Sequence, residues 1–267
     1  MYTALFNIFN IAAGITILVY YFTHFKDANQ YFSYGFFVAS VFTFFQFLSL
    51  IFGGVQGLLY FLVAIFGLII SFFKVYIYVC TGMYLCSLIG YKDLPIVRKI
   101  LKSFSDEEIK IKEYIINVAL VAIGFIIFSV ILFKLTSPQV SAELKSVIEN
   151  KTFWSCSIIE KVNMILSMFS IVISEELIFR FVMPNLIAKI FDLKDKKYWI
   201  AIIITSIFWA FGHLNALDPA WVKFVQVFPG GIALGWLYKK HGLESSMIAH
   251  LVFNIALIFL SDSLILM

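Results

Sequence analysis

Long apolar runs separated by short polar segments dominate the chain and predict membrane-spanning helices. A span needs about 20 mostly apolar residues. Such runs cover 1–22, 32–53, 57–90, 113–134, 157–183, 198–214, 224–238 and 244–261. The third run is too long for one ordinary span and contains Lys74, so it is either one long protruding helix or two short ones. The pattern predicts an all-α, polytopic transmembrane helix bundle of about eight spans.

The composition independently places the chain in lipid. Hydrophobic residues make up 62% of it, charged residues only 13%, and phenylalanine occurs 31 times. A soluble domain of this length cannot bury so much apolar surface, because a core grows more slowly than the chain that covers it. The net charge of +4 is not arranged as a basic stripe with interleaved aromatic residues, so no nucleic-acid partner is expected. The expected partner is the lipid bilayer, and the oligomeric state stays open.

The polar segment 91–112 divides the chain into two parts. Residues 1–112 are predicted to form N-terminal transmembrane helices and a cytoplasmic amphipathic loop, and residues 113–267 hold all the candidate chemistry. Lys and Arg concentrate in this segment and in the loops after the fifth and seventh spans, which the positive-inside rule places in the cytoplasm. The C-terminus is then predicted to lie outside the cell membrane. The enrichment in Phe, Ile and Lys indicates a bacterial source.

The fifth run is unusual because charged residues interrupt its apolar sequence, FSIVISEELIFRFVMPNL. A charge at membrane depth costs several kcal/mol, so it must be paired or face a wet cavity. Glu176 and Arg180 are four residues apart and can pair on one helix face. Glu175 is displaced by about 100° and has no partner in its own helix, which suits a general base. The alternative is a purely structural Glu–Arg clamp, with Glu175 facing a cytoplasmic vestibule.

Polar residues also occur at helical spacing in the sixth and eighth runs. The segment SIFWAFGHL places Trp209 one turn before His213, which is predicted near the middle of the membrane or beyond. In HGLESSMIAHLVFN, His250 and Asn254 are four apart, so both project to one side and can donate hydrogen bonds to an oxyanion. Each of these residues can instead serve as an interhelical hydrogen-bonding group.

The order and spacing of these residues are more specific than any one of them. A Glu-Glu-x-x-x-Arg segment precedes an aromatic residue four positions before a histidine, and a His-x-x-x-Asn segment follows; the residues are Glu175, Glu176, Arg180, Trp209, His213, His250 and Asn254. In this pattern the sequence resembles the CPBP family, the CAAX-processing and bacteriocin-immunity intramembrane peptidases, over about residues 155–258. The GxxxG segment from Gly231 to Gly235 also resembles that family and lets helices approach closely. Trp209 stands where the family usually has Phe and keeps a supporting aromatic ring beside His213.

The resemblance implies an intramembrane endopeptidase that hydrolyses a peptide bond in a membrane-associated protein or peptide precursor. Carried over by position, Glu175 and His213 would activate the attacking water. His250 and Asn254 would stabilise the tetrahedral oxyanion. The Glu176–Arg180 pair would hold the site together.

Two interpretations of metal use fit these residues. Glu175, His213 and His250 could ligate zinc, with a water molecule in the fourth position. However, the sequence contains no HExxH segment, and the three residues come from separate predicted helices. The metal-free interpretation, in which a glutamate activates the water without a cofactor, is favoured.

Two other functions compete with a peptidase. A non-catalytic membrane scaffold, such as a bacteriocin self-immunity or regulatory protein, could use the same fold, because fold does not determine function. That alternative predicts that Glu175 is dispensable. A small transporter would need a polar path across the bilayer or inverted repeats, and the sequence shows neither.

Overall fold

The computed structural model describes residues 2–54, 58–101, 110–141 and 153–264 of the chain. Within these ranges, eight helices are long and apolar enough to cross a membrane, at 6–23, 32–52, 58–89, 111–136, 158–190, 195–216, 220–241 and 243–260. The predicted all-α polytopic bundle is therefore confirmed. By the length and composition of its helices, the chain is a multi-pass membrane protein.

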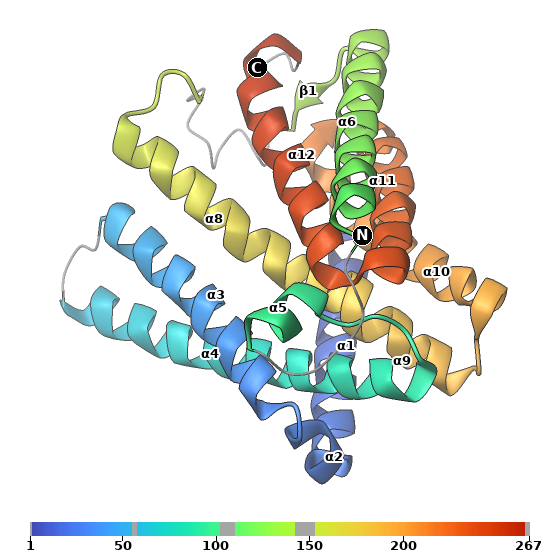
Figure 1. The fold of residues 1–267 in the computed structure, drawn as a ribbon. Coiled ribbons are helices and arrows are strands. Elements are labelled where there is room, and N and C mark those ends of the chain that lie inside the picture. The colour runs from blue at the N-terminus through green and yellow to red at the C-terminus, as the bar shows by residue number, and fades with distance from the viewer. Residues whose placement is uncertain (1, 55–57, 102–109, 142–152, 265–267) are drawn as a thin grey trace.

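Figure 1 shows the helices in chain order. The N-terminal part contains α1 (Tyr2–Thr23), α2 (Phe25–Asn29), α3 (Phe32–Phe52), α4 (Leu58–Ile89) and α5 (Pro95–Ile100). The C-terminal part contains α6 (Ile111–Thr136), α8 (Ile158–Glu176), η1 (Leu177–Val182), α9 (Met183–Ile190), η2 (Asp195–Lys197), α10 (Tyr198–Phe211), η3 (Leu214–Ala216), α11 (Ala220–His241) and α12 (Leu243–Leu264). Two short strands, β1 (Gln139–Val140) and β2 (Leu217–Asp218), pair antiparallel.

Two spans extend differently from their predicted limits. α4 is one continuous helix of 32 residues, which decides between the two alternatives for the third run. Its Lys74 has a partner at membrane depth, because Nζ lies 5.7 Å from the centre of the Tyr78 ring. The fifth span, predicted to end at residue 183, continues through the π-helical segment η1 into α9. Pro184 lies directly after η1, where the π-helical turn already interrupts the regular hydrogen bonds of this continuous helix.

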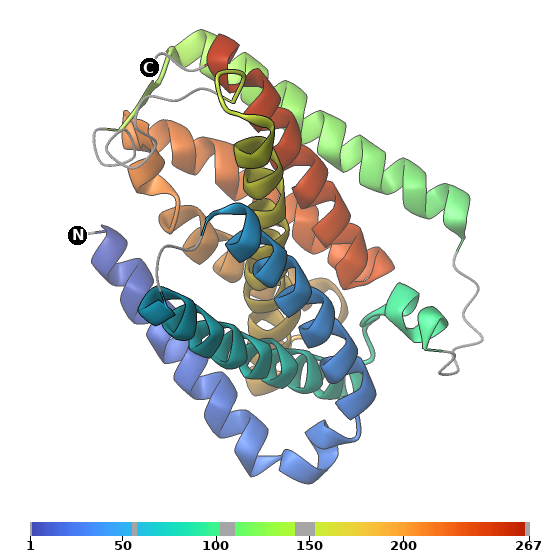
Figure 2. The same cartoon turned by 90° about the vertical axis from the view of Figure 1, so that its left-hand side faces the viewer.

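α8 lies at the centre of the bundle (Figure 2). It packs against α3 on one side and against α12 on the other, while α11 packs against both α10 and α12. The close approach predicted at the GxxxG segment occurs between α11 and α10. A Cβ atom at Gly231 would lie 2.8 Å from the Ser206 Cβ, and one at Gly235 would lie 2.4 Å from the Ile202 Cγ2. Both positions therefore exclude any side chain.

The N-terminal and C-terminal helices share one buried apolar core. A single cluster contains residues from α1, α4, η1 and α10, represented by Ile17, Val79, Phe181 and Tyr198. A buried hydrogen-bonded group lies at its edge, in which the Tyr198 hydroxyl donates to Asn185 Oδ1 at 2.7 Å. The part of the chain before residue 112 therefore packs directly on the elements that carry the candidate site.

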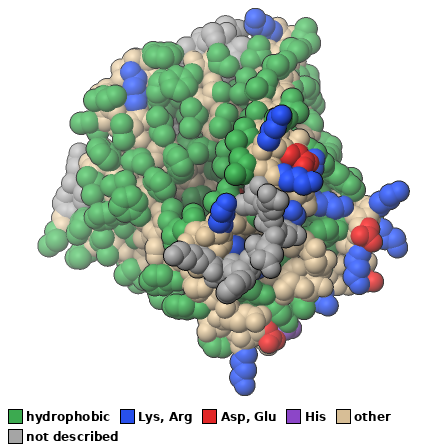
Figure 3. Space-filling view, in the orientation of Figure 1, with side chains coloured by type: hydrophobic (Ala, Val, Ile, Leu, Met, Phe, Trp, Pro, Cys, Tyr) green, Lys and Arg blue, Asp and Glu red, His purple; other side chains and the backbone are tan. Residues whose placement is uncertain are grey.

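The polar segment 91–112 is fastened to the bundle through α5. The Glu244 Oε1 accepts hydrogen bonds from the backbone N–H groups of Ile96 and Val97, both at 3.0 Å, at the start of that helix. Figure 3 shows apolar side chains over most of one face, with Lys and Arg gathered mainly toward its lower right. The predicted cytoplasmic loop includes residues 102–109, and the predicted outside C-terminus includes residues 265–267. Both ranges lie outside the described residues, so the topology stays a prediction.

Candidate active site

The Glu175 carboxylate lies at the meeting point of three helices. It projects from the last turn of α8, and its side chain is 24% exposed. The His213 Nε2 lies 3.7 Å from Glu175 Oε1, and the His250 Nε2 lies 3.8 Å from Glu175 Oε2. The three residues predicted from the sequence to form a site are therefore brought together, from α8, the end of α10 and α12.

His213 lies just beyond the end of α10, which finishes at Phe211, rather than on the helix itself. Its Nδ1 is 2.8 Å from the Trp209 carbonyl oxygen. A carbonyl only accepts, so this contact assigns the ring proton to Nδ1 in the neutral imidazole. The Nε2 lone pair then faces Glu175, and the side chain is 27% exposed and can be reached by water.

His250 is held by Glu176 in the same manner, but inside the bundle. The His250 Nδ1 lies 2.9 Å from Glu176 Oε1, and the two side chains are 3% and 0% exposed. Since the carboxylate accepts the Nδ1 proton, the other ring nitrogen, Nε2, is the one that faces Glu175. The sequence predicts Glu176 only as the partner of Arg180. The structure adds that Glu176 orients His250. The Glu176–His250 contact, at 2.9 Å, is shorter than the Glu176–Arg180 contact, at 3.7 Å.

Arg180 lies in η1, where the helix is π-helical, and its side chain is only 1% exposed. The predicted pairing with Glu176 exists, with the Arg180 Nε 3.7 Å from Glu176 Oε1. The Arg180 Cζ also lies 4.0 Å from the centre of the Trp209 ring. The guanidinium charge is therefore compensated partly by a carboxylate and partly by an aromatic face.

Trp209 contacts Arg180, Glu175 and both histidines of the site. Its Nε1 donates to Glu175 Oε2 at 2.8 Å, and its ring centre lies 5.1 Å from that of His213 and 5.2 Å from that of His250. The sequence assigns this residue only a packing role. The contact with Glu175 could have been expected from the sequence. A buried indole N–H usually finds an acceptor, and Glu175 has no partner in its own helix.

Two further residues lie near the site. Asn254 follows His250 by one turn of α12 and makes no side-chain hydrogen bond to another described residue. Lys223, which the sequence places in a loop, belongs to the first turn of α11, where its Nζ donates to Gln226 Oε1 at 2.8 Å. The Gln226 Nε2 donates in turn to Ser129 Oγ at 3.0 Å, so a short polar chain runs inside the bundle. The sequence feature that could have indicated this chain is the lysine directly before the apolar run 224–238.

A zinc site needs three or four protein ligands around one point. Among the described residues, no group of three His, Cys, Asp or Glu side chains is arranged so that it could hold a metal ion. The His213 and His250 nitrogens that face Glu175 lie 3.7 and 3.8 Å from its carboxylate oxygens, so the three side chains surround one point. A site without metal stays a prediction.

Comparison with known proteins finds one family and one curated protein that are similar to part of this chain. The model of the type II CAAX prenyl endopeptidase Rce1-like family matches residues 158–256, which include all the site residues described above. The sporulation-killing factor biosynthesis protein SkfC of Bacillus subtilis (strain 168) is 32% identical over 87 residues, which cover 32% of this chain and 17% of that protein. The chain thus matches less than a fifth of the length of this relative. No solved structure matches the chain significantly. Residues 158–256, which carry the Glu-Glu-x-x-x-Arg, His213 and His250 segments, are therefore similar to the type II CAAX prenyl endopeptidase Rce1-like family.

Proposed function

We propose that this protein is an intramembrane endopeptidase that hydrolyses a peptide bond in a membrane-associated protein or peptide precursor. The observation that carries the proposal is the convergence of Glu175 with the Nε2 atoms of His213 and His250, at 3.7 and 3.8 Å. The ionised Glu175 carboxylate and the neutral Nε2 of His213 are both acceptors. A water molecule between them donates one proton to each, which makes its oxygen a better nucleophile.

In the first step, Glu175 accepts a proton from the water while the water oxygen bonds to the peptide carbonyl carbon. The carbonyl π electrons move to its oxygen and form an oxyanion. When the intermediate collapses, Glu175 returns the proton to the amide nitrogen, the C–N bond breaks, and an acid and an amine result. Trp209 holds Oε2 at 2.8 Å during these steps, which leaves Oε1, next to His213, to face the water.

Oxyanion stabilisation falls to His250 and Asn254. In its imidazolium form, His250 donates the Nδ1 proton to Glu176 and the Nε2 proton to the oxyanion. Glu176 is fully buried and 2.9 Å away, so its negative charge balances the imidazolium in a medium of low dielectric constant. Asn254, one turn further along α12, supplies a neutral donor. These steps use only side chains of this protein, and we propose that they proceed without a bound metal.

We further propose that the substrate is a precursor of a secreted factor in the cell membrane of a bacterium. SkfC is named for the biosynthesis of a sporulation-killing factor, and it is 32% identical to this chain over 87 residues. The site itself lies within membrane-spanning helices, so a substrate must reach it through the bilayer or along a helix surface.

The test compares cells that carry the wild-type protein with cells that carry Glu175→Ala. Released peptides are identified by mass spectrometry, and membranes are then incubated with the processed precursor in water enriched in ¹⁸O. Cleavage by the wild type alone, with one ¹⁸O atom in the new carboxyl group, supports hydrolysis at Glu175. Equal processing by both proteins would instead favour the non-catalytic scaffold.

A further inference from the structure

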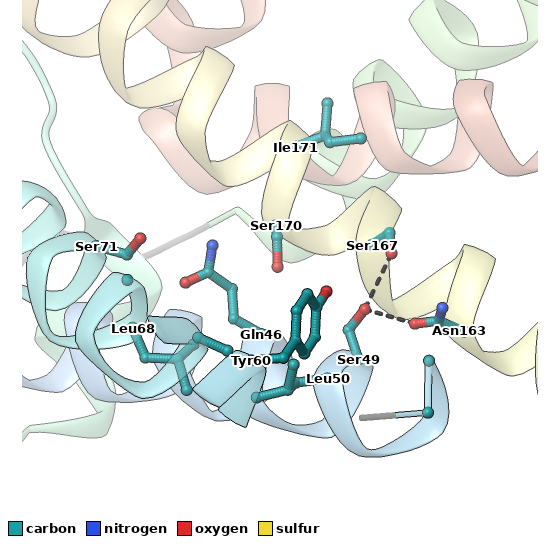
Figure 4. Close-up of a pocket in the computed structure, with 14 residues that line it drawn as sticks. Gln46, Ser49, Leu50, Tyr60, Leu68, Ser71, Asn163, Ser167, Ser170 and Ile171 are labelled. Atoms are coloured by element: carbon teal, nitrogen blue, oxygen red, sulfur yellow. Dashed lines mark hydrogen bonds between the residues drawn. The ribbon is translucent and has the colours of Figure 1, made fainter. Parts of the chain in front are cut away.

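A cavity of about 580 Å³ lies between α3, α4 and α8, and none of its lining residues belongs to the site described above (Figure 4). Its volume is in the range of ordinary small-ligand sites. Polar side chains from all three helices line it: Gln46, Ser49, Ser71, Asn163, Ser167 and Ser170. Two of these helices precede residue 158, so most of the cavity wall lies outside the region that matches the family.

The lining is polar but uncharged. None of the 14 residues that line the cavity is Lys, Arg, Asp, Glu or His. Ser49 Oγ bonds to Asn163 Oδ1 at 2.5 Å and to Ser167 Oγ at 3.0 Å. Gln46 Oε1 and Ser170 Oγ are buried and have no hydrogen-bond partner in the described structure. A cation, a phosphate or a carboxylate would find no countercharge here, whereas a neutral group with both donors and acceptors would be matched.

The residues of α8 that line the cavity extend from Asn163 to Ile171, toward the end of the helix that carries Glu175. From Asn163 to Ile171 the helix rises by about 12 Å, at about 1.5 Å per residue. An extended peptide of about four residues, at about 3.3 Å each, covers that length. Ile171 lines the cavity and precedes Glu175 by four residues, so it lies one turn before Glu175 on nearly the same helix face.

We propose that this cavity binds an extended, uncoiled segment of the substrate polypeptide next to the bond that is cut. The inference rests on the proposed peptidase function. A peptide bond must leave the helical conformation to be attacked, and its backbone N–H and C=O groups then lose their partners inside the bilayer. Each unsatisfied group costs several kcal/mol in lipid. The hydroxyl and carboxamide groups of α3, α4 and α8 replace the lost partners, which gives the helices before residue 158 a role in substrate selection.

Cysteine labelling tests this binding without requiring hydrolysis. Ser71→Cys, combined with Glu175→Gln and Cys156→Ser, is placed in phospholipid nanodiscs and treated with a charged, membrane-impermeant thiol reagent. Ile70→Cys in the same background is the matched control, because Ile70 is the preceding residue on α4, is 54% exposed and does not line the cavity. Two synthetic membrane-spanning peptides of equal length serve as probes, one of Leu and Ala throughout and one with a central Gly-Pro-Gly that interrupts its helix.

We expect Ser71→Cys to be labelled faster than Ile70→Cys, and the interrupted peptide alone to protect it. At a peptide concentration about ten times its Kd, labelling should slow by about tenfold, since only the free protein reacts. No difference between the two cysteines, no protection by either peptide, or equal protection by both would overturn the proposal. Because Glu175→Gln is used throughout, protection can be observed even if the protein is not a peptidase.

A cavity-filling variant supplies an independent check. A Cβ atom added at Gly67, which lines the cavity, would meet no atom within 4 Å, so Gly67→Leu fills the space without a clash. Gly124 on α6 is equally open and lies outside the cavity, so Gly124→Leu is the matched control. Gly67→Leu should abolish protection by the interrupted peptide, and Gly124→Leu should leave it unchanged. Protection that survives Gly67→Leu would show that the peptide binds elsewhere.

Discussion

Replacing Trp209 by Phe tests whether the indole N–H positions the base. The substitution keeps an aromatic ring beside Arg180 and the two histidines, and it removes the donor that lies 2.8 Å from Glu175 Oε2. A hydrogen bond to a charged group contributes about 1.5–3 kcal/mol. Glu175 is 24% exposed, so water can replace part of that interaction and the lower end of the range applies. A loss of about 1.4 kcal/mol in the transition state corresponds to about a tenfold lower rate.

The loss should appear in kcat rather than in KM. The indole holds the carboxylate and is not placed to bind the substrate, so its removal affects the orientation of the base during the chemical step. Cleavage of the processed precursor by purified protein in nanodiscs measures both constants. Trp236→Phe is the control, because Trp236 is also on a spanning helix but packs against Lys240, with Nζ 5.2 Å from its ring centre.

A spectroscopic measurement separates the contact from its effect on catalysis. The chain has five tryptophans, so ¹⁵N-labelled protein gives five indole N–H signals, and the one absent in Trp209→Phe belongs to Trp209. Glu175→Gln should move that signal upfield, because an amide oxygen is a weaker acceptor than a carboxylate. An unchanged Trp209 signal in Glu175→Gln, together with a kcat of Trp209→Phe equal to wild type, would refute the positioning role.

Three other predictions follow from the site and the fold. Glu175→Gln should abolish turnover without lowering the melting temperature, whereas Glu176→Gln should also destabilise the protein by about 3–5 kcal/mol, because it breaks a buried ion pair and the His250 contact; equal melting curves in differential scanning fluorimetry would contradict this division. Purified active protein should contain less than one equivalent of zinc by elemental analysis, and chelators should leave cleavage intact; activity lost on chelation and restored by zinc would make Glu175, His213 and His250 ligands. Thiol labelling of single cysteines should place Lys196 in the cytoplasm and Met267 outside, and labelling of both from one face would contradict the predicted orientation.

The spans could be predicted because a helix that crosses the bilayer must be mostly apolar over about 20 residues. Each of the eight helices of the described chain that are long and apolar enough to span corresponds to a predicted run. The limits failed where polar residues are stabilised by partners that sequence does not show. The sequence places Lys223 in a loop, because it does not show that Lys223 donates to Gln226, which in turn donates to Ser129. Lys74 left open whether the third run is one helix or two. The ring of Tyr78 lies beside Lys74 on the same helix only if that helix is continuous.

The site residues were predictable as a set, whereas their contacts were not. Spacing along one helix identifies Glu176 and Arg180 as a pair, and the ion pair at 3.7 Å exists. The shorter contact of Glu176, with His250 on α12, depends on how two distant helices meet. The same holds for the indole of Trp209 and Glu175, which are 34 residues apart. Helical periodicity describes one element at a time, so it identifies which faces are polar but not which faces meet.

The two adjacent glutamates acquire different environments because they are adjacent. Consecutive residues on a helix point about 100° apart, so only one of them can face the interior of a packed bundle while the other faces a boundary. Glu176 points inward, is fully buried and is committed to His250 and Arg180. Glu175 points toward the meeting point of α8, α10 and α12, is partly exposed and has a direct hydrogen bond only to Trp209 among the site residues. A committed carboxylate next to an accessible one is what a hydrolytic site requires, since the first fixes an imidazole and the second remains able to accept a proton from water.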